Sequence, residues 1–243
     1  MTEGAGRDDR LYFRQLLAGR DVARRDAIAR QMVNFVYLVG DRQTGEAVVV
    51  DPAYAPGELV DLVEADGMRL VGALATHYHA DHVGGSLFGY EIAGVCDLLE
   101  RVSLPVHVQK AEVPWIVRSA GLERSDLVEH DGDETITVGD LEIRFVHTPG
   151  HTPGSQCFLV DGRLVAGDTL FLEGCGRTDL PGSDPAAMYD SLINRLARLP
   201  DDTLVYPGHL YSAEPSATLG ETKRWNPVLA PRSAEEWLRV FGG

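Results

Sequence analysis

Three histidines and an aspartate lie within six consecutive positions, in the segment T-H-Y-H-A-D-H-V-G-G at residues 76–85. The apolar run at residues 70–75 precedes this segment and predicts a buried strand that leads into it. Imidazole nitrogen and carboxylate oxygen are ligands that suit zinc and neighbouring first-row metals. The sequence therefore predicts a metal site at the end of this strand. Its candidate ligands are His77, His79, Asp81 and His82.

The alternative interpretation places these histidines on the surface of a polar loop. It does not explain why they follow an apolar strand directly, or why the glycine pair Gly84-Gly85 comes after them. A strand that ends in a tight loop can instead aim alternate side chains at one point. We therefore favour the metal site.

The composition predicts one large domain. Of the 243 residues, 44% are hydrophobic and 24% are charged, which is enough for a substantial core. We expect residues 11–243 to form this domain after a mobile tail at residues 1–10.

The net charge of -15 argues against nucleic acid or an anionic membrane as a partner, because both require a basic face. We expect a small-molecule substrate.

The cysteines predict a reducing environment. Cys96, Cys157 and Cys175 are widely spaced and include no C-x-x-C pair, so neither a disulfide framework nor a thiolate metal site is indicated. The first ten residues lack the apolar segment of a signal peptide, and no later stretch is long enough to span a membrane. We therefore expect a cytoplasmic protein.

The order of apolar and turn residues predicts strand-rich segments in two halves, each with helices outside. The expected strands and hairpins cover residues 11–17, 34–39, 47–50, 70–75, 105–108, 135–146, 158–166 and 203–206. The expected helices cover residues 57–65, 86–100 and 111–120, and two more begin at Asp184 and near Ser233. This pattern favours two sheets packed face to face between helical layers.

Three more metal-competent residues stand where predicted strands end, namely His151, Asp168 and His209. Strand ends on one edge of a sheet can converge on a single site. The order H-x-H-x-D-H, then H, then D, then H, over about residues 33–230, resembles the metallo-β-lactamase superfamily. This resemblance implies an α/β fold, a four-layer αββα sandwich of two mixed sheets flanked by helices.

The resemblance also implies a role for each ligand. The first metal would be held by His77, His79 and His151, the second by Asp81, His82 and His209, and Asp168 would bridge them. We expect two divalent ions, with zinc first and iron or manganese as alternatives, because all three metals accept mixed imidazole and carboxylate ligands. Asp51 matches the family's strand-end aspartate, which we expect to orient the loop and the ligands. We expect His107, His130 and His147 to be structural.

Two metal ions that share a water lower its pKa and hold a hydroxide ready to attack. Asp81 is expected to orient this hydroxide in addition to binding metal.

The segments G-C-G-R-T-D at residues 174–179 and Y-P-G-H at residues 206–209 resemble the glyoxalase II-like hydrolases, which cleave glutathione thioesters. We therefore expect a thioester hydrolase first, because a thiolate leaves without strong acid assistance. The candidate substrate contacts are Arg177, Tyr211 and Lys223.

The chain also resembles the persulfide dioxygenases. The shared segments are F-R-Q-L at residues 13–16, G-D at 40–41, the G-C-G-R-T-D segment, and R-W-N-P at 224–227. This resemblance implies one iron held by His77, His151 and Asp168, with open positions for a sulfur substrate and oxygen. We keep this oxidoreductase as the alternative, because D-H-V-G-G at residues 81–85 is hydrolase-like. A β-lactamase and a non-catalytic metal-binding domain are more remote alternatives.

Overall fold

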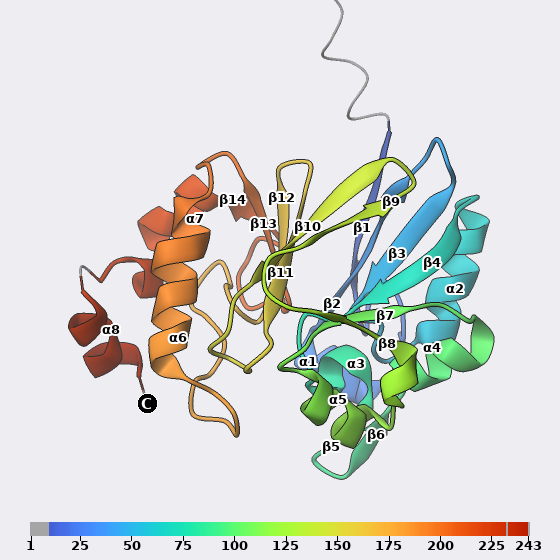
Figure 1. Ribbon diagram of the computed structural model, residues 1–243, viewed down its shortest axis with the longest axis horizontal. Coiled ribbons are helices and arrows are strands. Elements are labelled where there is room, and N and C mark those ends of the chain that lie inside the picture. Colours follow the sequence, from blue (N-terminus) through green and yellow to red (C-terminus); the bar gives the residue numbers. More distant parts are fainter. Residues whose placement is uncertain (1–9, 232, 243) are drawn as a thin grey trace, which may run out of the picture.

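The computed structural model describes residues 10–231 and 233–242. In this part of the chain, two six-stranded sheets face each other, and helices cover both outer faces (Figure 1). The four-layer αββα sandwich expected from the sequence is therefore confirmed. The tail expected at residues 1–10 lies, except for Arg10, outside the described residues.

The first sheet has the strand order β1-β2-β3-β4-β7-β8. Its strands are β1 (Leu11–Leu17), β2 (Phe35–Asp41), β3 (Glu46–Val50), β4 (Arg69–Leu74), β7 (Val106–Gln109) and β8 (Leu127–His130). The first three are antiparallel, whereas β3, β4, β7 and β8 run parallel. Because β3 and β4 are parallel, the residues that follow them, Asp51 and His77, emerge at the same edge of the sheet.

The second sheet has the strand order β14-β13-β12-β11-β10-β9. Its strands are β14 (Ala217–Thr218), β13 (Leu204–Pro207), β12 (Arg163–Gly167), β11 (Gln156–Val160), β10 (Leu141–His147) and β9 (Thr135–Val138). Neighbours are antiparallel except β12 and β13, which are parallel. The strands β10, β12 and β13 therefore end at one edge, where the chain continues to His151, Asp168 and His209.

An aromatic core fills the space between the sheets. Phe35 and Tyr37 of β2 pack in one buried cluster with Phe145 of β10 and Phe158 of β11. The rings of Phe145 and Phe158 meet edge to face, with centroids 5.0 Å apart. Burying a side chain such as phenylalanine is worth about 1.5–3 kcal/mol, so this cluster contributes strongly to holding the two sheets together.

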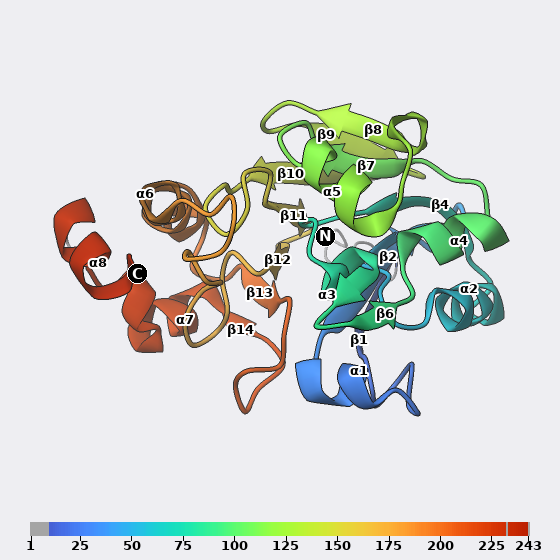
Figure 2. The same cartoon turned by 90° about the horizontal axis from the view of Figure 1, so that it is seen from below.

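Helices form both outer layers, as Figure 2 shows from below. The first sheet is covered by α1 (Ala27–Met32), α2 (Pro56–Ala65), α3 (Ala80–Val83), α4 (Val95–Arg101) and α5 (Val113–Ala120), with a 3-10 turn at Arg124–Asp126. The second is covered by α6 (Pro185–Tyr189), its extension through Asp190–Arg195 and Leu196–Arg198, α7 (Leu219–Trp225), Pro227–Leu229 and α8 (Ala234–Phe241). None of the helices in the described ranges is long and apolar enough to cross a membrane.

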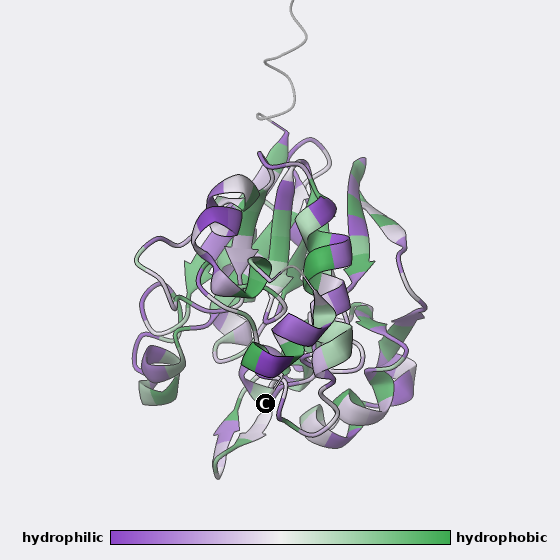
Figure 3. Cartoon of the chain, turned by 90° about the vertical axis from the view of Figure 1, so that its left-hand side faces the viewer, coloured by the Kyte–Doolittle hydropathy of each residue, from purple (hydrophilic) through white to green (hydrophobic). Residues whose placement is uncertain are grey.

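The helices over the second sheet are apolar on one side only, and Figure 3 shows hydrophilic and hydrophobic positions mixed along them. Asp184, the predicted N-cap of α6, accepts hydrogen bonds from the backbone N–H groups of Ala186 and Ala187 at 2.8 and 3.0 Å. Trp237 of α8 is fully buried, and its indole N–H donates to the carbonyl of Val228 at 3.0 Å. The final helix is therefore anchored to the domain by one large side chain.

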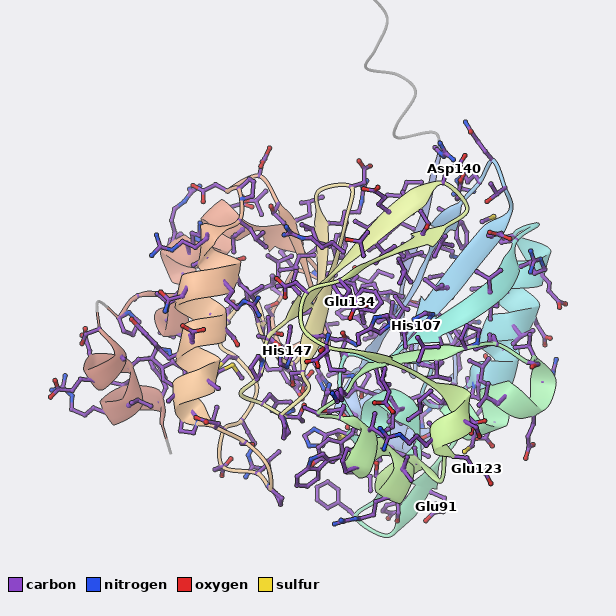
Figure 4. The ribbon with its side chains drawn as sticks, in the orientation of Figure 1. Glu91, His107, Glu123, Glu134, Asp140 and His147 are labelled. Carbon is purple, nitrogen blue, oxygen red and sulfur yellow. The ribbon has the colours of Figure 1, made fainter. Side chains whose placement is uncertain are left out.

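The prediction of a single helix at residues 86–100 is wrong. The strand β5 (Gly85–Leu87) pairs with β6 (Tyr90–Ile92) in a hairpin, and α4 begins only at Val95. Phe88 and Gly89 form the turn with φ angles of 51° and 83°, a left-handed conformation that an α-helix cannot contain. Figure 4 shows Glu91 of this hairpin at the end of the molecule opposite Asp140, which lies in the β9–β10 turn.

Candidate metal centre

The loop after β4 holds the four ligands predicted from the first motif. His77 and His79 lie in the loop, and His79 is the residue directly before the short helix α3. Asp81 and His82 lie within α3, which ends at Gly84 with a φ of 90°. Glycine adopts this backbone conformation at little cost, so the chain can turn away at once. All four side chains therefore start from one compact segment.

Three imidazoles form the first ligand group, His77, His79 and His151. His79 Nδ1 lies 3.0 Å from His77 Nε2 and 3.0 Å from His151 Nε2. With metal–nitrogen bonds of about 2.1 Å, two ligands at a right angle are separated by about 3.0 Å. The three nitrogens are therefore spaced to share one ion.

The second ligand group consists of Asp81, His82 and His209. The two Nε2 atoms of His82 and His209 are 3.3 Å apart. Asp81 Oδ2 lies 3.6 Å from His82 Nε2 and 3.4 Å from His209 Nε2. The sequence separates His209 from the other two ligands widely, and the fold brings all three together.

Asp168 lies between the two groups. Its Oδ2 is 3.7 Å from His151 Nε2 and 3.4 Å from His209 Nε2, and its Oδ1 is 3.4 Å from His82 Nε2. Within the described residues, Asp168 Oδ1 is a fully buried side-chain oxygen without a hydrogen-bond partner. Such an oxygen is costly to bury, and a bound cation would remove the cost. The residues present therefore fit a metal centre.

Hydrogen bonds turn the ligand nitrogens toward the centre. The Nδ1 atoms of His151 and His209 donate to the backbone carbonyls of Arg177 and Met32, each at 2.8 Å. His82 Nδ1 donates to Asp51 Oδ2 at 2.8 Å. In each ring the other nitrogen, Nε2, then faces the cluster, which is the arrangement found around metal-binding histidines.

Burial keeps two imidazoles of the first ligand group, those of His77 and His79, uncharged. Burial lowers the pKa of His77 well below its ordinary value, with nearby His82 as the next cause. Burial and the proximity of His151 lower the pKa of His79 to about 4. At neutral pH these imidazoles therefore carry no proton that a metal ion would have to displace.

The second ligand group has the opposite electrostatics. Burial disfavours the charged form of His82, but carboxylates, with Asp168 foremost, outweigh burial and raise its pKa to about 10. The pKa of His209 is also raised, because Asp168 outweighs burial there too. Metal binding at this group therefore releases protons and becomes more favourable as the pH rises.

Asn34 contacts the second ligand group and was not identified from the sequence. Its amide nitrogen Nδ2 lies 3.1 Å from Asp81 Oδ2, 3.3 Å from His82 Nε2 and 3.5 Å from His209 Nε2. The hydroxyl of Tyr54 donates to the other amide atom, Oδ1, at 3.1 Å. This bond orients the N–H groups of Asn34 toward the ligand atoms. The only signal in the sequence is a polar residue directly before an apolar strand.

A cavity of about 630 Å³ opens beside the two ligand groups. Tyr211 lines it, and its ring stacks on His209 with centroids 4.7 Å apart. Arg177 also lines it, but its guanidinium pairs with Asp179. Lys223, the third predicted substrate contact, is not among the lining residues and donates to Asp201 at 2.6 Å instead.

The other three histidines lie outside both ligand groups. His107 Nδ1 is 2.9 Å from His130 Nε2, and His130 Nδ1 donates to Glu134 at 2.8 Å. His147 Nε2 donates to the carbonyl of Pro153 at 3.2 Å. Figure 4 shows His107 and Glu134 in the middle of the molecule and His147 on the side of the second sheet. Each of these histidines has a structural hydrogen bond.

In this structure two sheets face each other, and the loops at one edge bring histidines and aspartates together. This arrangement places the chain in the class of metal-binding αββα proteins. The family model described as the Metallo-beta-lactamase superfamily matches residues 29–209. The chain belongs to this superfamily.

Known relatives include enzymes of two kinds. The human mitochondrial persulfide dioxygenase ETHE1 is 35% identical over 213 residues, which cover 86% of this chain and 76% of that protein. The hydroxyacylglutathione hydrolase of Bradyrhizobium sp. (strain ORS 278) is 38% identical over 207 residues, which cover 83% and 72%. The crystal structure of ETHE1 from Myxococcus xanthus superposes with a TM-score of 0.77 and 31% identity, covering 96% of this chain and 90% of that one.

Proposed function

We propose that this chain is an iron-dependent dioxygenase that oxidises the terminal sulfur of an organic persulfide. The hydrolase that the sequence led us to expect first becomes the second candidate. Two of the three relatives described above are ETHE1 proteins, and the human one is a persulfide dioxygenase. The similarity to the Myxococcus structure extends over 96% of this chain.

The position of Asn34 is the structural observation that carries this proposal. Its amide nitrogen lies within 3.5 Å of all three ligand atoms of the second group. An amide N–H group donates hydrogen bonds and cannot bind a cation, so the hydrogen bond from Asn34 to Asp81 Oδ2 competes with a second ion for that oxygen. One ion held by His77, His151 and Asp168 is therefore favoured over a pair.

The overall reaction would be R–S–S⁻ + O₂ + H₂O → R–SH + SO₃²⁻ + H⁺. The two sulfur atoms together lose four electrons and the oxygen molecule gains four, so no further reductant is required. A bound iron would supply the electron-transfer chemistry that lets a persulfide react with oxygen. His77, His151 and Asp168 would hold it, and Tyr211 shields His209 from solvent on the cavity side.

The proposal is tested with protein loaded with iron under anaerobic conditions. We expect oxygen uptake on addition of a persulfide, with about one sulfite formed per oxygen molecule consumed, as the equation requires. Zinc-loaded protein is the control and should consume no oxygen. Iron-loaded protein that consumes no oxygen with any persulfide offered would rule out the dioxygenase.

Hydrolysis of a thioester is the second candidate, because the second ligand group is complete and Asp168 lies between both groups. The Bradyrhizobium hydrolase is also 38% identical to this chain. His82→Ala separates the two candidates. A two-metal hydrolase would lose most of its activity with S-lactoylglutathione, whereas a one-iron dioxygenase would retain much of its oxygen uptake.

A further inference from the structure

Glu112 is a carboxylate outside both ligand groups, and it is 1% exposed. It lies directly before α5, and within the described chain it makes no capping hydrogen bond to that helix. A buried carboxylate is costly unless its oxygens accept hydrogen bonds. The partners of these oxygens therefore indicate what the side chain does.

Both oxygens of Glu112 accept hydrogen bonds from the backbone of other segments. Its Oε1 accepts one from the N–H of Tyr78 at 2.7 Å. Its Oε2 accepts one from the N–H of Gly154, also at 2.7 Å. Hydrogen bonds to an ionised acceptor are about twice as strong as those between neutral groups. One buried side chain thus links two segments that are far apart in the sequence.

Both of these segments carry ligands of the proposed single ion. Tyr78 directly follows His77, and Gly154 follows His151 by three residues. His77 comes from the loop after β4 of the first sheet, and His151 comes from the loop after β10 of the second. Glu112 therefore ties together two ligand loops that belong to different sheets.

The helix α5, which lies beside α3 in both ribbon views (Figures 1 and 2), adds two more contacts with Tyr78. The carbonyl of Tyr78 accepts a hydrogen bond from the hydroxyl of Ser119 at 3.2 Å. Its ring stacks on that of Trp115, with centroids 5.1 Å apart and planes inclined by 24°. A site supported by a helix is held more precisely than one supported by loops alone. Glu112 thus extends a rigid support from Tyr78 to Gly154.

We infer that Glu112 is a positioning residue, which holds the loops of His77 and His151 at the spacing that one shared metal ion requires. Bonds from a metal ion to its ligands keep within about 0.2 Å of their ordinary length, so a small shift of either loop weakens the site. His77 and His151 belong to the one-iron ligand set and also to the first ligand group of a two-metal centre. The role is therefore the same in a dioxygenase and in a hydrolase, and it goes beyond the proposed function.

The test is Glu112→Gln, which keeps the shape of the side chain but turns an amide N–H group toward one of the two backbone N–H donors. We expect the affinity of the protein for cobalt(II) to fall about 10–100-fold. The visible spectrum of the bound ion should change as well, because the two imidazoles are displaced relative to each other. Circular dichroism should remain that of the folded protein, since the N–H of Gln156 still joins the two loops through the carbonyl of Thr76 at 2.9 Å.

Two comparisons assign the effect to the ligands His77 and His151. In a His82→Ala background, which removes a member of the second ligand group, Glu112→Gln should lower cobalt affinity by the same factor. Glu134→Gln, which alters the hydrogen bond to His130 away from the centre, is the control and should leave the affinity and the spectrum unchanged. Because metal binding is the readout, the result does not depend on which reaction the protein catalyses.

Glu112→Asp offers a second route if Glu112→Gln does not fold. It keeps the charge, but its carboxylate is set back by about 1.5 Å and cannot reach both backbone N–H groups. We expect a loss of cobalt affinity in the same range and a changed spectrum. A folded variant with the affinity and the spectrum of the unmodified protein would overturn the role assigned to Glu112, even if its free energy of unfolding were lower.

Discussion

Asp51 Oδ2 accepts a hydrogen bond from His82 Nδ1 at 2.8 Å, which joins the end of β3 to the helix that carries two candidate ligands. The same carboxylate accepts hydrogen bonds from the N–H and the hydroxyl of Thr76, at 2.8 and 2.6 Å. Thr76 Oγ1 in turn lies 3.0 Å from His77 Nδ1. One carboxylate is therefore connected to both ligand groups.

Asp51→Asn should weaken metal binding without preventing folding. Asp51 has a φ of 53°, a conformation that asparagine also tolerates, so the backbone is preserved. The amide provides one acceptor where the carboxylate provides two, and it removes the charge that orients His82. We expect zinc affinity, measured by competition with a chelator, to fall about 10–100-fold. Affinity equal to that of the unmodified protein would show that Asp51 does not orient the ligands.

Asn34→Ala should increase the number of ions bound. The substitution removes the amide N–H groups that lie beside Asp81, His82 and His209. We expect elemental analysis after zinc loading to change from about one ion per chain to about two, because the ligand atoms lose a competing donor. Asn194→Ala, at an exposed hydrogen bond with Asp190, is the control. Two ions in the unmodified protein would refute the single-ion centre.

Glu112 should make the stability of the metal-free protein fall as the pH rises. Burial raises its pKa from the ordinary 4.5 to about 7, although Thr152 and the backbone N–H groups of Tyr78 and Gly154 oppose the change. Because the folded pKa is above the unfolded one, the folded chain keeps a proton that the unfolded chain loses between about pH 4.5 and 7. Stability is therefore lost across this window, by roughly 3 kcal/mol.

Chemical denaturation at several pH values, with Glu112→Gln as the reference, isolates this contribution from the other titrating groups. The free energy of unfolding of the unmodified protein should decline relative to the variant from about pH 4.5 to 7 and run parallel to it above that range. Curves that stay parallel throughout would mean that the pKa of Glu112 is not raised.

Trp237→Ala should destabilise the domain at a site far from the ligand groups. The side chain is fully buried in one apolar cluster with Leu192 and Leu196, and its indole N–H donates to the carbonyl of Val228. Truncating a buried tryptophan costs about 3–5 kcal/mol, because it leaves a cavity. Thermal denaturation should show this loss, whereas Val240→Ala, at a position that is 59% exposed on the same helix, should leave the melting temperature nearly unchanged.

The ligand set could be predicted from the sequence because its pattern is local. His77, His79, Asp81 and His82 lie within six positions after an apolar run, and the other ligands follow strands that the alternation of residues already indicated. The strand at residues 11–17 was predicted with the bounds that the structure has. The helix expected over residues 86–100 forms only from Val95 onward, because the apolar spacing contains no information about the positive φ angles of Phe88 and Gly89.

Other features were decided only by the tertiary structure. Asn34 meets Asp81, His82 and His209, and Glu112 meets Tyr78 and Gly154, across separations of 34 to 175 residues. Local pattern specifies which chemical groups reach the sheet edge, since strand and turn geometry depend on adjacent residues. Which donors and charges surround those groups depends on how distant segments pack.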